Sequence, residues 1–125
     1  MNLIISNKSD KPLYEQIYDQ TVTQIINGDL PANYCLPSIR TVARELSISI
    51  ITIKKAWELL ENNNFIYTVK GKGCYVKEHS ANKLSDKKFE IAREKVQKDI
   101  VYYDSLNMNL NEIINLFTEE YNKKN

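Results

Sequence analysis

The chain has 125 residues and a net charge of +1, with 42% hydrophobic and 26% charged residues, which fits one ordinary domain or a domain of about 75 residues with an appendage too short to bury a core alone. No stretch approaches the roughly 18 apolar residues of a membrane span, and the start lacks the basic and long apolar regions of a signal peptide. We therefore expect no membrane partner and a cytoplasmic location.

The first helix is predicted from about residue 12 to Asn27. Pro12 is tolerated in a first turn because its missing N–H would be unpaired there anyway, and Gly28 suits the left-handed residue that ends a helix. Between them, apolar and aromatic side chains recur at helical spacing, at Leu13, Tyr14, Ile17, Tyr18, Val22 and Ile25.

Residues 36–57 have the pattern of a helix-turn-helix. Ser38 can cap a second helix that runs to about Leu46, and Ser49 can cap a third helix over residues 50–63. The third helix has one stripe of residues expected in the core, formed by Ile53, Ala56, Trp57 and Leu60. Two short amphipathic helices joined by a tight polar turn are typical of proteins that bind double-stranded DNA.

A β-hairpin follows the third helix, which ends at Asn62-Asn63-Asn64. Residues 65–69 are β-branched and aromatic, residues 74–77 form a second short strand, and Lys70-Gly71-Lys72-Gly73 makes a basic tip. Two strands alone are marginally stable, so this hairpin must pack on the helices. It is therefore predicted to be a wing.

The chain is wholly helical from Lys83, with a break at Asn107-Met108-Asn109. Asn109 and Glu112 have the spacing of a capping box for the last helix. Two such helices cannot cover both of their apolar faces, so we expect them to pack against the winged domain, another subunit or both, with a homodimer favoured. The stripes consist of Phe89, Ala92, Val96, Ile100, Tyr103, Leu110, Ile113, Ile114, Phe117 and Tyr121.

The predicted fold class is therefore mainly α with a small β-wing. A winged helix-turn-helix domain occupies residues 1–79, with its core over 11–77, and a two-helix dimerisation tail occupies residues 80–125. Between Arg40 and Lys77, seven basic residues stand against three acidic ones, a net charge of +4, while the flanking segments are acidic or neutral. A positive field on one face suits attraction to phosphates, although a solvated charged surface would explain the count equally well.

The sequence resembles the GntR-type winged-helix transcription regulators over roughly residues 11–77. The opening Pro-Leu-Tyr-Glu-Gln-Ile and the short tail are similar to the YtrA subfamily, whose tail is a dimerisation unit too small for the ligand pockets of larger relatives. No small-molecule effector is therefore supported. The matching segments are residues 12–17, 26–28, 36–43, 52–61 and 65–73.

Three positions depart from the family pattern. Asn33 and Asn64 stand where family members usually have glycine, and asparagine also tolerates a left-handed backbone. Ile50 stands where many members carry an arginine that contacts DNA. That loss removes a guanine contact or a phosphate clamp, so specificity inferred from relatives does not transfer to this chain.

The resemblance and the pattern together give candidate DNA-binding residues. Arg40 matches the family arginine that approaches DNA, with a surface ion pair as the alternative, and Thr52 either donates to a phosphate or stabilises its helix turn. Ile50 and Ile51 either enter the core or meet thymine methyl groups. The full set is Ser38, Arg40, Ser49, Ile50, Ile51, Thr52, Lys54, Lys55, Lys70, Gly71 and Lys72.

Other chemistry finds no support in the sequence. His79 is a lone histidine without a second metal ligand nearby, and Gly71-Lys72-Gly73 lacks the spacing of a P-loop. We expect no metal, no cofactor and no enzyme activity. The two cysteines, Cys35 and Cys74, lie far apart and are expected to be reduced.

The predicted function is a homodimeric repressor that binds a palindromic double-stranded DNA operator through helix 50–63 and the wing 65–77. Two-fold symmetry places the half-sites about one helical turn, roughly 34 Å, apart. The alternative is a winged-helix protein-interaction module without sequence-specific DNA binding. A ligand-sensing tail is a third possibility, for which the sequence supplies no candidate.

Overall fold

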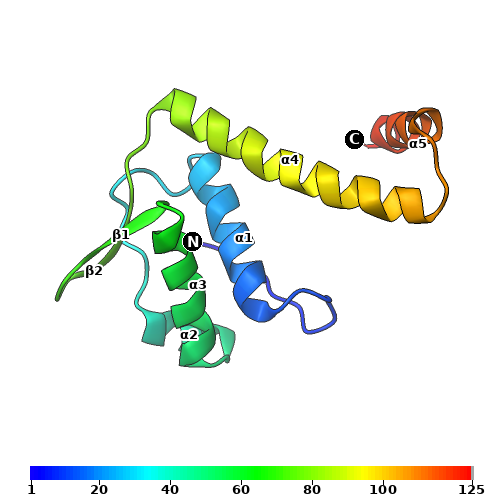
Figure 1. Ribbon diagram of the computed structural model, residues 1–125. Helices are drawn as coiled ribbons and strands as arrows, with labels where there is room; N and C mark the ends of the chain where they lie inside the picture. Colours follow the sequence, from blue (N-terminus) through cyan, green and yellow to red (C-terminus); the bar gives the residue numbers. More distant parts are fainter. Residues whose placement is uncertain (125) are drawn as a thin grey trace. The chain divides into compact units, whose positions relative to one another are not determined.

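The computed structural model describes residues 1–124 of the protein (Figure 1). Its described residues confirm the predicted mainly α fold with a two-stranded antiparallel wing. The chain divides into two compact units, Met1–Ser85 and Asp86–Asn125. The elements are α1 (Leu13–Ile26), α2 (Ile39–Leu46), α3 (Ile50–Asn62), β1 (Ile66–Val69), β2 (Gly73–Val76), α4 (Ala81–Ser105) and α5 (Leu110–Asn122).

Helix α3 is the centre of the first unit, where it contacts α1, α2 and β1. The predicted stripe is confirmed, because Ile53, Ala56, Trp57 and Leu60 are all at most 3% exposed. Trp57 is therefore a core residue. Around this stripe pack Ile17, Val22 and Ile25 from α1, Val42 and Ala43 from α2, and Phe65, Ile66 and Val76 from the wing.

The predicted caps of the two helix-turn-helix helices are present. The hydroxyl oxygen of Ser38 accepts a hydrogen bond from the backbone N–H of Thr41 at 3.1 Å. The hydroxyl oxygen of Ser49 likewise accepts from the N–H of Ile51 at 3.1 Å. Each cap pairs one of the N–H groups that a helix start leaves free, so the serines set where α2 and α3 begin.

Left-handed residues end several segments. Asn33 (φ 66°) and Asn64 (φ 63°) adopt the positive φ expected where asparagine replaces glycine, and Gly28 (φ 84°) follows α1 as predicted. Ser47 (φ 55°) also lies in this region, which the sequence did not indicate. It ends α2 and turns the chain into α3.

The wing pairs Ile66 with Val76 and Val69 with Gly73 in antiparallel register. Strand β1 begins one residue later than predicted, and β2 begins one residue earlier. Phe65 lies between α3 and β1: its N–H donates to the carbonyl of Leu60 at 2.9 Å, and its carbonyl accepts from the N–H of Lys77 at 2.9 Å. Residues 33–36 run beside β2 and add backbone hydrogen bonds, from Asn33 N–H to Val76 and from Leu36 N–H to Cys74.

Residues 1–6 form an extended segment held by a row of glutamines on α1. The Gln16 and Gln20 amides each accept from one backbone N–H, of Ser6 and Ile4, and donate to the carbonyl of the same residue. Gln24 donates to the carbonyl of Asn2. The intervening side chains of Met1, Leu3 and Ile5 pack against the core.

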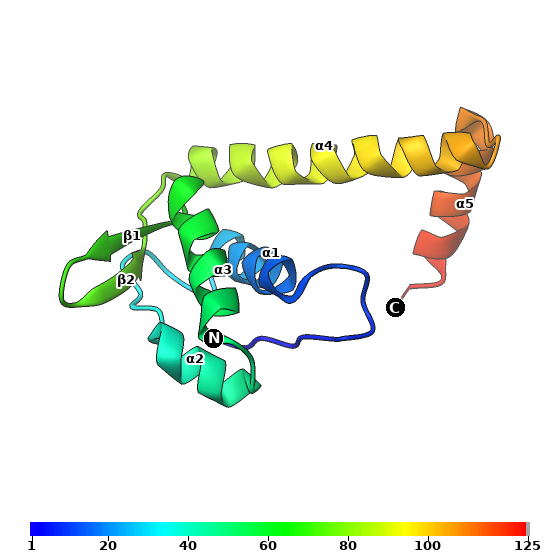
Figure 2. The same cartoon turned by 60° about the horizontal axis from the view of Figure 1, so that its bottom comes forward.

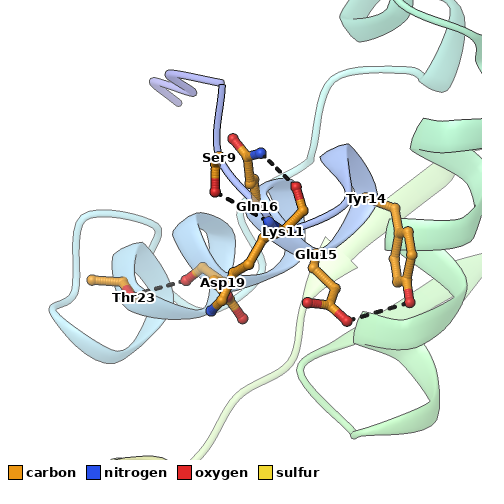
Figure 3. Close-up of polar contacts among 7 residues, drawn as sticks. All are labelled: Ser9, Lys11, Tyr14, Glu15, Gln16, Asp19 and Thr23. Atoms are coloured by element: carbon orange, nitrogen blue, oxygen red, sulfur yellow. Dashed lines mark hydrogen bonds and ion pairs between the residues drawn. The ribbon is translucent and has the colours of Figure 1, made fainter. Parts of the chain in front are cut away.

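The start of α1 carries a second set of polar contacts, drawn in Figure 3. The Gln16 amide also donates to the carbonyl of Lys11 at 2.9 Å. The Lys11 ammonium donates to the Asp19 carboxylate at 2.8 Å, and this hydrogen bond raises the pKa of Lys11 above its ordinary value. These contacts fasten the end of the N-terminal segment to α1.

The second unit contains most of α4 and all of α5. The predicted capping box is confirmed, because the Asn109 side chain accepts from the N–H of Glu112 at 2.9 Å and the Glu112 carboxylate accepts from the N–H of Asn109 at 3.0 Å. The rings of Tyr103 and Phe117 meet edge to face, with centroids 6.0 Å apart. Among residues 1–124, no helix is long and apolar enough to cross a membrane.

Candidate nucleic-acid interface

The first turn of α3 presents two isoleucines to solvent. Ile50 is 45% exposed and Ile51 is 77% exposed, so neither side chain is buried in the core. The Ser49 cap fixes where the turn begins and therefore which residues occupy its outer face. The structure thus removes the core alternative for this pair, while their contact with thymine stays a prediction.

The two lysines that follow have different surroundings. The Lys55 ammonium lies 3.9 Å from the ring centroid of Tyr14, a cation–π contact that ties it to α1. Lys54 is exposed, and the described residues offer it no such partner. Of the two lysines, Lys54 is therefore the one whose ammonium is available to bind an anion. The contact of Lys55 with Tyr14 joins residues 41 positions apart and has no signal in the sequence pattern.

Arg40 lies in the first turn of α2 and is exposed. Its guanidinium forms no ion pair with any residue of the described chain, so the predicted alternative of a surface ion pair is not present. Thr52 is half-buried, and its backbone N–H donates to the carbonyl of Ser49 at 3.1 Å. Ser38 and Ser49 use their hydroxyl oxygens as helix caps and so position these neighbours.

The wing tip is an open turn. Gly71 has a φ of 78°, and nothing lies within 4 Å of where a Cβ would stand. Lys70 and Lys72 flank it and are exposed, and the N–H of Lys72 closes the turn on the carbonyl of Val69 at 2.9 Å. Figures 1 and 2 show this tip extending beyond the three helices of its unit.

A side-chain hydrogen bond ties the wing to α3. The Thr68 hydroxyl on β1 donates to the Glu61 carboxylate near the end of α3. Phe65 and Ile66 are buried against the same helix. The wing therefore has a defined position relative to α3, which a groove-binding helix and a flanking backbone contact require. Sequence reasoning missed the Glu61 contact, because Glu61 resembles any exposed helical acid.

A helix-turn-helix whose second helix, here α3, is capped and exposed beside a basic hairpin defines the winged-helix class of DNA-binding proteins. Residues 13–76 match the GntR family of bacterial regulatory proteins. The chain belongs to this family, whose members are transcriptional regulators that bind DNA. Comparison with individual proteins makes the assignment finer.

The chain is 30% identical over 97 residues to the transcriptional repressor YtrA of Bacillus subtilis, an alignment that covers 78% of this chain and 75% of YtrA. It is 40% identical over 72 residues to the repressor NagR of the same organism, which covers 58% of this chain and only 30% of NagR. A transcriptional antiterminator from Listeria monocytogenes EGD-e has a similar structure, with a TM-score of 0.76, 32% identity, and coverage of 97% of this chain and 90% of that one. The resemblance to YtrA-like GntR regulators is therefore confirmed.

The predicted dimerisation residues lie on surfaces that the second unit leaves open. Seven of these residues have large apolar side chains that are between 46% and 70% exposed. Of the other three, Tyr103 and Ile113 are half-buried and Ala92 is exposed. Neither α4 nor α5 has a buried residue among those described. The seven are Phe89, Val96, Ile100, Leu110, Ile114, Phe117 and Tyr121.

Proposed function

We propose that the protein is a homodimeric transcriptional repressor that binds a palindromic DNA operator in the cytoplasm. The observation that carries the proposal is the pairing of an exposed first turn on α3 with a basic wing held to the same helix through Glu61 and Thr68. Residues 1–79 act as the DNA-binding domain, and residues 80–125 act as the dimerisation tail. The mechanism needs no cofactor or small-molecule effector.

Helix α3 enters the major groove with its N-terminal turn toward the base edges, which is the usual geometry of a recognition helix. Lys54 and Arg40, both exposed, contact phosphates or guanine edges at the groove. Thr52 donates to a phosphate from the same turn. Lys55 contributes positive charge while its ammonium stays over Tyr14.

The wing contacts the backbone or minor groove beside the site of α3. Lys70 and Lys72 supply the charge, and Gly71 lets the turn approach closely because it has no side chain. Phosphate contacts of this kind set position and affinity but read no sequence. Specificity therefore depends on the residues of α3 and on Arg40.

The tail joins two copies through the apolar stripes of α4 and α5. Exposed apolar patches of this extent are unfavourable in water and mark interaction surfaces. A second copy carries the same stripes, so a two-fold interface can bury both sets at once. Two-fold symmetry then places the operator half-sites about one helical turn, roughly 34 Å, apart.

The test begins with a random duplex DNA library, from which the protein should select a palindromic site. In a mobility-shift titration on that site, Arg40→Ala should weaken binding by on the order of 1–3 kcal/mol, about five- to 160-fold. Arg93→Ala is the matched control, since Arg93 is also exposed but lies on the tail, and it should bind like the wild type.

Three outcomes would each contradict one part of the proposal. Failure to select any DNA would instead favour the winged-helix protein-interaction module. Equal affinities for the Arg40 and Arg93 variants would remove the role given to Arg40. Sedimentation equilibrium measures the dimer separately, and a monomeric mass at micromolar concentration would exclude the proposed assembly.

A further inference from the structure

Ile50 and Ile51 are the large apolar side chains that α3 leaves exposed. The rest of the outer face of this helix is charged, with Lys54, Lys55 and Glu58. Exposed isoleucine is unfavourable in water in proportion to its apolar area, and two adjacent ones at the start of a recognition helix form a small apolar surface. A partner that binds this surface should therefore present an apolar group to the two isoleucines.

The charges around this surface identify the partner. Arg40 and Arg44 on α2 and Lys54 on α3 are exposed, and the segment from Arg40 to Lys77 carries a net charge of +4. A polyanion complements this field, whereas an apolar partner protein would have to leave these charges unpaired. The major groove of DNA presents one apolar group on its base edges, the C5-methyl of thymine.

We propose that Ile50 and Ile51 read thymine methyl groups, so that each operator half-site carries thymines opposite the first turn of α3. This inference rests on the proposed DNA-binding function and adds the chemistry of base recognition to it. The contact is direct readout by apolar surface, and it distinguishes thymine from cytosine, which has no methyl group at that position.

The geometry of α3 divides the readout between neighbouring side chains. Ile51 and Lys54 are three residues apart and therefore share one face of the helix. Ile51 is the more exposed isoleucine, at 77%, so it carries most of the methyl contact, while Lys54 holds an adjacent phosphate or guanine. Lys55 is held at Tyr14 and does not compete for this face.

The test uses the duplex selected from the random library, made once with thymine and once with deoxyuridine at the positions protected by α3. Deoxyuridine keeps the base pairing and removes the C5-methyl group. Wild-type protein should bind the deoxyuridine duplex about fourfold more weakly for each buried methyl group, and about sixteenfold more weakly when one methyl is lost from each half-site.

Two variants test whether Ile51 is the residue that contacts the thymine methyl group. Ile51→Ala should lose most of the wild-type preference for the thymine duplex over the deoxyuridine duplex, because Ile51 carries most of the methyl contact. Ile4→Ala is the matched control, since Ile4 is 82% exposed and lies on the N-terminal segment, and it should keep the full wild-type preference for thymine. Both side chains are exposed, so neither variant should impair folding.

The outcomes separate this inference from the proposed function. Equal wild-type affinity for the two duplexes, or selected sites without thymine at these positions, would overturn thymine reading while DNA binding stands. An unchanged thymine preference in Ile51→Ala would overturn the role of Ile51. If the library yields no bound DNA at all, both the proposed function and this inference fail.

Discussion

The turn between α2 and α3 contains a serine in a conformation that usually belongs to glycine. Ser47 has φ 55° and ψ 45°, its N–H donates to the carbonyl of Arg44 at 3.3 Å, and the next N–H, of Ile48, donates to Ala43 at 3.0 Å. These two bonds form a Schellman motif, whose left-handed position favours glycine. We predict that Ser47→Gly stabilises the protein.

The magnitude follows from two opposing terms. A left-handed conformation costs a residue with a Cβ roughly 1–2 kcal/mol, and glycine escapes this cost. Glycine in turn loses more chain entropy on folding, about 0.5–1 kcal/mol relative to alanine. The difference is a net stabilisation of about 0.5–1 kcal/mol. For a domain of this size it raises the melting temperature by about 2–8 °C.

Thermal unfolding followed by circular dichroism measures the effect, with Ser47→Ala as the control. Ser47 is exposed, and its hydroxyl makes no hydrogen bond within the described residues. Alanine therefore removes no interaction and keeps the Cβ, so its melting temperature should stay close to that of the wild type. A Ser47→Gly melting temperature no higher than that of Ser47→Ala would refute the argument from backbone strain.

Three further predictions concern other parts of the chain. Lys72→Ala should lower the slope of log affinity against log salt by about 0.9 per lost phosphate contact, about 1.8 for a two-fold dimer, and an unchanged slope would exclude a backbone contact. Val96→Glu should give a monomer in sedimentation velocity, because it adds a charge to a stripe residue that is 53% exposed in the single chain, whereas Gln97→Glu beside it should stay dimeric. Gln20→Ala removes both hydrogen bonds to Ile4, so the Ile4 amide should exchange faster and stability should fall by about 1 kcal/mol; equal protection in the two proteins would contradict the clamp.

The parts of the fold that follow local rules could be predicted from the sequence. The buried stripe of α3 follows from helical periodicity, and the serine caps and the capping box at Asn109 follow from side chains that bond to backbone a few residues away. Asn64 belongs to this group as well, because asparagine is an accepted substitute for glycine in a left-handed turn. Each of these signals lies within one helical turn of its effect.

What the sequence could not predict depends on residues brought together by the fold. Serine rarely adopts a positive φ, so Ser47 gave no local sign of its conformation. Gln16 and Gln20 resemble ordinary surface residues of a helix until an extended segment lies beside them. The contact of Lys55 with Tyr14 and that of Glu61 with Thr68 likewise need the packed structure. These contacts decide which charges of the candidate site are available.

The two exposed apolar surfaces of the chain differ in the charge around them, and this difference separates their partners. The isoleucines of α3 lie in a segment of net charge +4, whereas residues 86–125 carry seven basic and eight acidic side chains, a net charge of −1. A surface with almost balanced charge does not repel a second copy of itself, and its apolar stripes can pair by symmetry. A strongly basic surface does repel a copy and attracts a polyanion instead. High salt should therefore weaken DNA binding steeply and leave the proposed dimer intact, since apolar burial is not screened by ions.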